Sequence, residues 1–243
     1  MSKRDILVLV EGEKTDYKLM ESLFETYEIE ERHQLVPYGT NIHALYNSAF
    51  KGKDIENIDI ILHLREHEKD PIKKSLFDQR YSDIVLVFDL DPQDSSYSAN
   101  AILEMSEYFI DSTDMGKLYI NYPMIEAFYH VKSIPDLDYN SYICTLEDLK
   151  GHKYKKRVDQ ESVIKDRKSI FTQKSSCNTI IRQNIEKARR VAGNPHSEVS
   201  GVHLPKQTDI LNKQLEKLDK EQAVFVLCTC AFYIVDYNSK MIE

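Results

Sequence analysis

The feature that most constrains this chain is a short apolar run that ends in a carboxylate and a glycine. Residues Ile6–Val10 are all apolar, and Glu11 and Gly12 follow them directly. Such a run predicts a buried strand, and an apolar pattern with helical spacing begins near Thr15. Open α/β sheets bind ligands at the carboxyl ends of their strands, where the chain turns into a helix. Glu11 is therefore expected to stand at a cleft.

A second apolar run has the same form and ends in two acids. Residues 83–88 predict another buried strand, and Asp89 and Asp91 follow it at alternate positions. Side chains two apart on an extended segment point the same way, so these two carboxylates are expected to face one ion together. Mg²⁺ prefers oxygen ligands and often uses one or two carboxylates, so we expect them to bind Mg²⁺ or Mn²⁺.

The spacing of apolar residues predicts an α/β protein with a parallel-rich sheet flanked by helices. We expect a sheet domain over residues 1–134, with an insertion at about 52–82, and a basic, mostly helical region over 135–243 packed on it. The predicted strands span 5–10, 33–37, 83–88 and 117–121, and the predicted helices span 15–31, 41–50, 99–111, 124–131, 152–192, 207–220 and 221–237.

Composition narrows the class of protein. The chain has 243 residues with 42% hydrophobic and 30% charged content, which is typical of a soluble globular protein. It has neither a run of about 18 apolar residues nor a signal-peptide pattern, so we expect a cytoplasmic protein without a membrane span. The four cysteines lack paired C-x-x-C spacing, and Cys228 and Cys230 are expected to pack in the core.

The two strand ends together resemble the TOPRIM domain of topoisomerases, primases and several nucleases. Glu-Gly follows the first strand, and a later strand ends in Asp-x-Asp. Three longer strings are similar to the small TOPRIM nucleases of phage defence, the OLD/RloB/AriB-like group, over roughly residues 5 to 131. These strings are Glu11–Asp16, Tyr38–Ile42 and Asn121–Glu126.

The residues and the resemblance predict the same chemistry. Asp89 and Asp91 would bind the metal ion, and Glu11 would act as general acid or base or bind a second ion. Asp94 is a candidate further metal ligand or a cap of the following segment. Gly12, Lys14 and Glu126 are expected to support the site; Lys14 could hold a phosphate or be an ordinary surface lysine.

The resemblance also implies a biological setting. It implies an antiphage abortive-infection effector that is controlled by an ABC-type ATPase partner. A homodimer is a candidate active form. It slightly favours RNA such as tRNA over DNA as substrate. The chain lacks the Walker A string G-x-x-x-x-G-K-[ST] and should not hydrolyse ATP by that route.

A basic segment stands out against the acidic remainder of the chain. Residues 150–190 contain 13 lysines and arginines against 4 acids, a net charge of +9, and the rest of the chain carries −17. This distribution is compatible with a nucleic-acid enzyme, or with an ordinary solvated helix face. The residues expected to contact nucleic acid, with Tyr154 stacking on a base, are Lys153, Tyr154, Lys155, Lys156, Arg157, Lys165, Arg167 and Lys168.

Other functions stay open at this point. A TOPRIM domain without activity could serve as a sensor or assembly module. Asp-x-Asp also occurs in haloacid-dehalogenase-like phosphatases and in sugar-nucleotide glycosyltransferases, although Pro92-Gln93 is unusual after the phosphatase motif and neither class needs Glu11.

Two further stretches have competing interpretations. The string His63–His67 matches the inverted zinc-peptidase pattern H-x-x-E-H, although a charged surface segment explains it as well. The apolar run Ala223–Val235 could contact a partner or belong to the core.

Overall fold

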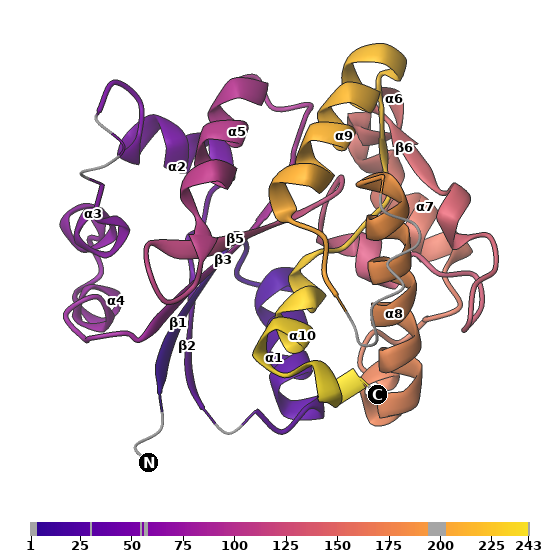
Figure 1. Ribbon diagram of the computed structural model, residues 1–243, viewed down its shortest axis with the longest axis horizontal. Helices are drawn as coiled ribbons and strands as arrows, with labels where there is room; N and C mark the ends of the chain where they lie inside the picture. Colours follow the sequence, from indigo (N-terminus) through magenta and orange to yellow (C-terminus); the bar gives the residue numbers. More distant parts are fainter. Residues whose placement is uncertain (1–3, 30, 54, 56–57, 194–202, 243) are drawn as a thin grey trace.

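A five-stranded sheet forms the centre of the N-terminal half in the computed structural model, which describes residues 4–29, 31–53, 55, 58–193 and 203–242 (Figure 1). The strand order is β2-β1-β3-β5-β4; β4 is antiparallel to β5 and the other pairs are parallel. The prediction of an α/β fold with a parallel-rich sheet flanked by helices is confirmed. The strands are β1 (Asp5–Val10), β2 (Arg32–Pro37), β3 (Asp83–Asp89), β4 (Ile110–Asp111) and β5 (Gly116–Asn121).

The central strands are buried on both faces, which explains their unbroken apolar sequences. Every side chain of Ile6–Val10 is at most 1% exposed, and the side chains of Val85–Phe88 are fully buried. Helices cover the two faces of a parallel sheet, so its strands do not alternate between polar and apolar residues. Because β1 and β3 are paired in parallel, their carboxyl ends lie side by side. The first polar residue after each apolar run therefore lies at the same edge of the sheet.

Helices of the N-terminal half follow the predicted order with shifted ends. The helix expected over 15–31 begins at Thr15, as expected, but ends at Thr26. The segment expected to be helical over 124–131 is a short 3₁₀ helix, η2. The predicted insertion contains two short helices, and its residues 54, 56 and 57 lie outside the described part. The elements are α1 (Thr15–Thr26), α2 (Ile42–Ala49), α3 (Ile60–His67), α4 (Pro71–Leu76), α5 (Ala99–Tyr108) and η2 (Ile125–Tyr129).

The C-terminal half is mostly helical, as predicted, but the segment expected to be helical over 152–192 is interrupted at 162–168, and a small second sheet is also present. β6 (Ile143–Thr145) pairs antiparallel with β7 (Ala223–Phe225). The helix predicted over 221–237 is therefore wrong: the run begins as a strand and ends in a short helix, α10. The remaining elements are η3 (Tyr139–Ser141), α6 (Leu146–Leu149), η4 (Lys150–His152), α7 (Lys153–Glu161), η5 (Ser169–Thr172), α8 (Lys174–Val191), α9 (Gln207–Glu221), η6 (Cys230–Phe232), α10 (Tyr233–Tyr237) and η7 (Ser239–Ile242).

The apolar run Ala223–Val235 lies where the C-terminal half packs against the sheet. Thr229 donates its hydroxyl hydrogen to the carbonyl of Ile120 on β5 at 2.8 Å, and Leu227 pairs with Tyr122 just beyond that strand. Most of the run is buried in one continuous core with the sheet, including Cys228 and Cys230. The core interpretation of this run is confirmed, and the alternative of an exposed partner-binding surface is wrong.

A buried lysine fixes the start of the C-terminal half. Lys187 on α8 is 1% exposed, and its ammonium group donates to the carbonyls of Tyr139 and Tyr142 at 2.8 and 2.7 Å. Each carbonyl also accepts a backbone N–H, Tyr139 from Tyr142 and Tyr142 from Val226, so the ammonium group is a second donor to both and ties α8 to this segment. No helix within the described ranges is long and apolar enough to cross a membrane.

Candidate functional site

Glu11 and Asp89 meet where β1 and β3 end. The backbone N–H of Glu11 donates to the carbonyl of Val87 at 3.0 Å, and the backbone N–H of Asp89 donates to the Glu11 carboxylate at 3.1 Å. Buried Asn121, at the end of β5, donates its side-chain amide hydrogen to the Asp89 carboxylate at 3.3 Å. Three neighbouring strands thus fix the two carboxylates that the sequence places at strand ends.

Asp91 reaches the site by a different route from the one predicted. β3 ends at Asp89, and Asp91 adopts a left-handed backbone conformation with a φ of 44°. Its carbonyl accepts the N–H of Asp94 in a turn, so the extended geometry expected for Asp-x-Asp is wrong. Aspartate tolerates this conformation better than most residues, and such strain is common at functional sites. The turn still leaves Asp91 near enough to Glu11 for the Asp91 charge to raise the pKa of the Glu11 carboxyl group.

Asp16 is a fourth carboxylate of the site, and its role was not predicted from the sequence. It lies in the first turn of α1 and is 7% exposed. A Cβ added to Gly12 would lie 2.7 Å from an Asp16 carboxylate oxygen. Glycine at this position therefore leaves room for the Asp16 side chain to turn in toward the strand ends. The signal available in the sequence was an acid in the first turn of the helix that follows Glu-Gly.

A fifth carboxylate and two cations complete the group. Glu126 on η2 is 3% exposed, and its Oε1 lies 3.4 Å from Nζ of Lys155 and 3.9 Å from Nη1 of Arg167. Lys155 comes from α7 and Arg167 from the segment that leads into η5. The C-terminal half thus contributes the positive charge that faces the acids of the sheet.

Burial is the main cause of the shifted pKa values in this group. Burial and the nearby Asp91 raise the pKa of Glu11 to about 8, although the Asp89 N–H opposes the shift. Burial raises the pKa of Asp16 to about 6, and Glu126 adds to the effect while Lys155 opposes it. The pKa of Asp89 is well above its ordinary value, because of burial and then the neighbouring carboxylates Glu11, Asp16, Asp91 and Glu126.

Asp91 and Lys155 show the same balance of burial and charge. Burial raises the pKa of Asp91, against a hydrogen bond from Gln93 and the charges of His43 and Lys155. Burial would lower the pKa of Lys155, but Glu126, Asp89 and Asp16 raise it above its ordinary value. An ammonium with a raised pKa stays charged at neutral pH, so Lys155 is a permanent cation beside titrating acids.

Two carboxylate oxygens of the group have no hydrogen-bond partner within the described residues. They are Oδ1 of Asp16 and Oε2 of Glu126, and both are buried. Buried acceptors without partners are rare, because losing hydration without compensation is costly. All-oxygen donors with unsatisfied lone pairs suit a hard divalent cation such as Mg²⁺. As the side chains lie, no three histidine, cysteine, aspartate or glutamate residues of the described part already converge on one metal position.

Asp94 and Lys14 lie at the margin of this group. The Asp94 carboxylate accepts hydrogen bonds from Asn41 at 2.7 Å and from the backbone N–H of Ser96 at 2.8 Å. The Ser96 hydrogen bonds and then Asn41 lower the pKa of Asp94 despite some burial. These contacts match the capping alternative for Asp94. Lys14 is exposed and lines a groove beside the site.

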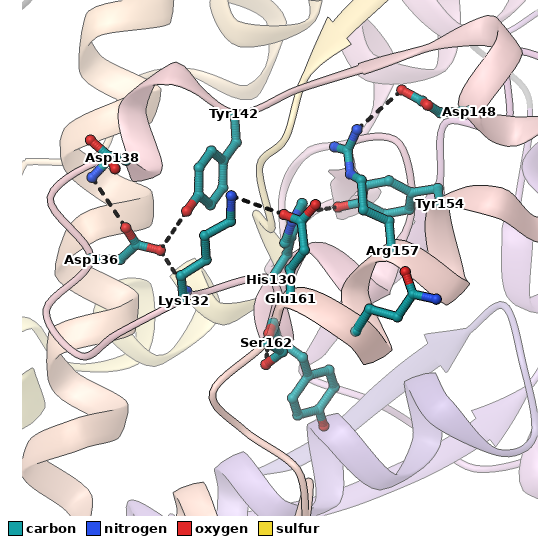
Figure 2. A network of polar contacts seen from close by, with 12 residues as sticks. His130, Lys132, Asp136, Asp138, Tyr142, Asp148, Tyr154, Arg157, Glu161 and Ser162 are labelled. Carbon is teal, nitrogen blue, oxygen red and sulfur yellow. Dashed lines mark hydrogen bonds and ion pairs between the residues drawn. The ribbon is translucent and has the colours of Figure 1, made fainter.

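The basic segment is largely tied into the fold instead of forming a free arm. Figure 2 shows the network that attaches α7, in which Arg157 pairs with Asp148 at 3.2 Å and Glu161 pairs with Lys132 at 3.1 Å. Lys165 donates to the carbonyls of Asp159 and Gln160, and Lys153 pairs with Glu147. Lys156 is exposed and makes no ion pair within the described ranges.

Tyr154 cannot stack on a base, so that prediction is wrong. The side chain is 1% exposed, and its hydroxyl contacts Nδ1 of His130 at 3.2 Å (Figure 2). The Arg157 guanidinium lies 5.3 Å from the centre of its ring. Tyr154 alternates with the basic residues because it is the inward position of an amphipathic helix, which lysines surround on the solvent side.

The H-x-x-E-H string lies on α3, and its histidines have partners in the fold. Nε2 of His63 lies 3.1 Å from Oγ of Ser48, and Nδ1 of His67 lies 2.8 Å from the carbonyl of His63. The two rings stand 4.1 Å apart. Burial, followed by the charge of His67, lowers the pKa of His63 to about 4. These contacts are consistent with a structural role for His63 and His67 in the packing of the insertion.

Comparisons with known proteins add no identification: no family model, no curated protein and no solved structure matches this chain.

The crowded acids predict that stability falls as the pH rises from about 4.5 to about 8 in the presence of EDTA. Their pKa values are higher in the folded than in the unfolded chain, so the folded state binds more protons in this window and loses stability as they leave. Glu11→Gln keeps an acceptor for the Asp89 N–H but removes a charge. We expect it to raise the unfolding free energy at pH 8 by about 1–2 kcal/mol.

Urea unfolding of both proteins between pH 5 and 9 measures this effect. Glu107→Gln removes an exposed charge from α5 and serves as the matched control, with an expected change below about 0.5 kcal/mol. A Glu11→Gln protein no more stable than wild type at pH 8 would show that the carboxylates do not strain the fold.

Proposed function

We propose that this protein is a divalent-metal-dependent nuclease of TOPRIM type that hydrolyses a phosphodiester bond at the carboxyl ends of β1 and β3. The observation that carries the proposal is a group of five carboxylates that faces Lys155 and Arg167 and leaves two carboxylate oxygens without hydrogen-bond partners among the described residues. Asp16, Asp89 and Glu126 of this group are buried, and Glu11 and Asp91 are partly buried. Such a group costs stability, and binding a cation and an anionic substrate would offset that cost.

The side chains divide naturally between two tasks. Asp16, Asp89, Asp91 and Glu126 offer the oxygen ligands that would hold Mg²⁺ or Mn²⁺. A bound ion of this kind neutralises charge on the phosphate and increases the acidity of a coordinated water. Glu11 has a pKa of about 8 and can therefore take up or give a proton near neutral pH. Lys155 and Arg167 would stabilise negative charge on the phosphate oxygens.

The first test of this function is metal-dependent cleavage by the purified chain. With Mg²⁺ or Mn²⁺ present, we expect it to cut at least one of tRNA, single-stranded RNA and plasmid DNA. Asp89→Asn keeps the shape of the side chain and its contact with Asn121, so the protein should fold but lose at least about 100-fold in activity. Calorimetric titration with Mn²⁺ should show weakened binding in the same variant. Wild-type metal affinity in Asp89→Asn would contradict the assignment.

Lys155 provides a second test, independent of the acids. Lys155→Met keeps the length of the side chain but removes the charge next to Glu126, and we expect a loss of about 10²–10³ in kcat with a smaller change in KM. The matched control is Lys150→Met, which removes an exposed lysine whose contact is with Glu147 on the surface. Equal losses in both variants would mean that general charge, not this position, matters.

The resemblance also supports a proposal about the cellular role. We propose that the chain is the toxic effector of an antiphage system, held inactive by an ABC-type ATPase in the cytoplasm and released on infection. Co-expression with an ATPase encoded beside it should reduce toxicity and yield a complex on size-exclusion chromatography. Full toxicity that the ATPase leaves unaltered would contradict this role.

A further inference from the structure

A groove of about 770 Å³ lies next to the acidic group, between α1 and the segment that contains η5. The two walls are held together by a hydrogen bond from the Thr26 hydroxyl to the carbonyl of Phe171 at 3.4 Å. Arg167 belongs to both places, because it lines the groove and also lies 3.9 Å from the Glu126 carboxylate. A molecule bound in the groove would therefore extend directly from the acids.

The end of the groove near the acids is positively charged. Lys14 directly precedes α1, and Lys18 follows it four residues later, in the first turn of the helix. Both line one wall of the groove, and Arg167 and Lys168 lie on the opposite wall. Lys14, Lys18 and Lys168 make no ion pair with any described residue, unlike most of the lysines on α7. Three uncompensated ammonium groups and one guanidinium favour an anion with more than one charge.

The far end of the groove carries the opposite charge. Glu21 and Glu25 continue the same face of α1 beyond Lys18, and both are exposed. Carboxylates there repel phosphates, so the charged part of a bound chain would stay at the lysine end. The groove therefore fits a few nucleotides beside the acids better than a long backbone.

Two flat surfaces lie among these charges. Phe171 is partly exposed in the groove, and its ring is parallel to that of buried Phe128 at 6.0 Å between centres. The Arg167 guanidinium lies 4.8 Å from the centre of the buried Tyr129 ring, which holds the guanidinium in place. Nucleic-acid bases stack on aromatic rings and on guanidinium planes, but they can do so only when they are not already stacked in a duplex.

We infer that this groove binds a single-stranded segment of nucleic acid that flanks the bond to be cut, with its phosphates on Lys14, Lys18 and Lys168 and an unstacked base on Phe171. The inference rests on the proposed nuclease function, and it adds the strandedness of the substrate and the path by which the substrate approaches. It also moves the expected contact surface from the solvent face of α7 to the wall between α1 and η5.

Fluorescence anisotropy with a labelled single-stranded RNA, and with the same sequence as a duplex, tests this binding site. The full-length Asp89→Asn protein in Mg²⁺ is the parent, so that binding is measured without cleavage. Adding Lys14→Glu and Lys18→Glu should weaken single-strand binding at least 10-fold and reduce the salt slope by about 1.4, which corresponds to two phosphates. Lys51→Glu with Lys74→Glu changes the net charge equally at exposed sites elsewhere and should have little effect.

Phe171→Leu tests the stacking surface without emptying the space against Phe128. We expect a roughly 5- to 150-fold weaker affinity for the single strand, which is the range for losing one stacked base. Unchanged affinity in both the lysine and the phenylalanine variants would overturn the groove, as would equal losses in the Lys51/Lys74 control. Duplex binding as tight as single-strand binding would overturn the assigned strandedness.

Cleavage assays on the same substitutions, made with Asp89 intact, separate this inference from the proposed function. Metal-dependent cleavage that the groove substitutions leave unchanged would reject the groove and keep the nuclease. Groove-dependent binding without cleavage under any metal condition would keep the groove and reject the nuclease. Loss of cleavage in the groove variants that is overcome by raising the substrate concentration would support both.

Discussion

The repulsion between carboxylates at the ends of β1 and β3 is the constraint on which the rest of this structure depends. Glu11 and Asp89 are fixed by the register of a parallel sheet, and burial raises the pKa of both. The hydrogen-bond donors that compensate there are the backbone N–H of Asp89 and the side-chain amide of Asn121. The remaining compensation must come from outside the sheet, and Lys155 and Arg167 supply it through Glu126.

This requirement explains why the C-terminal half is built as it is. Lys155 can balance the acids only if α7 is held at a fixed place, and α7 has just nine residues. Buried Tyr154 and the contacts of His130 and Lys132 with Glu161 attach the helix to the segment that follows η2 (Figure 2). Glu126 lies on η2 and Lys155 on α7, so the attachment of α7 to the segment after η2 also brings these two residues together. Much of the basic segment serves this attachment, which leaves few of its charges free.

The sequence predicted what depends on the strands and missed what depends on the turns and the tertiary contacts. Unbroken apolar runs identified β1 and β3, and so placed Glu11 and Asp89. The left-handed Asp91 was beyond the reach of the pattern, because the alternation rule assumes that the strand continues. The burial of Tyr154 was not evident because α7 is rich in lysine and has only two inward positions, Tyr154 and Val158. The strand β7 was not evident because a continuous apolar run has no period that separates a strand from a helix. Asp16 was overlooked, although Gly12 makes room for it.

The placement of charge also indicates from which side an anionic chain would approach the acids. Burial raises the pKa values of the acids at the ends of β1 and β3, whereas Lys14, Lys18 and Lys168 are exposed and without ion pairs in the described part. An anionic chain would meet the exposed cations first and the acids last, since long-range attraction acts on the approach while the acids repel it. Arg167 lies at the boundary, 3.9 Å from Glu126 and against the ring of Tyr129. Because its guanidinium faces both regions, a phosphate that reaches it would lie between the lysines and the carboxylates.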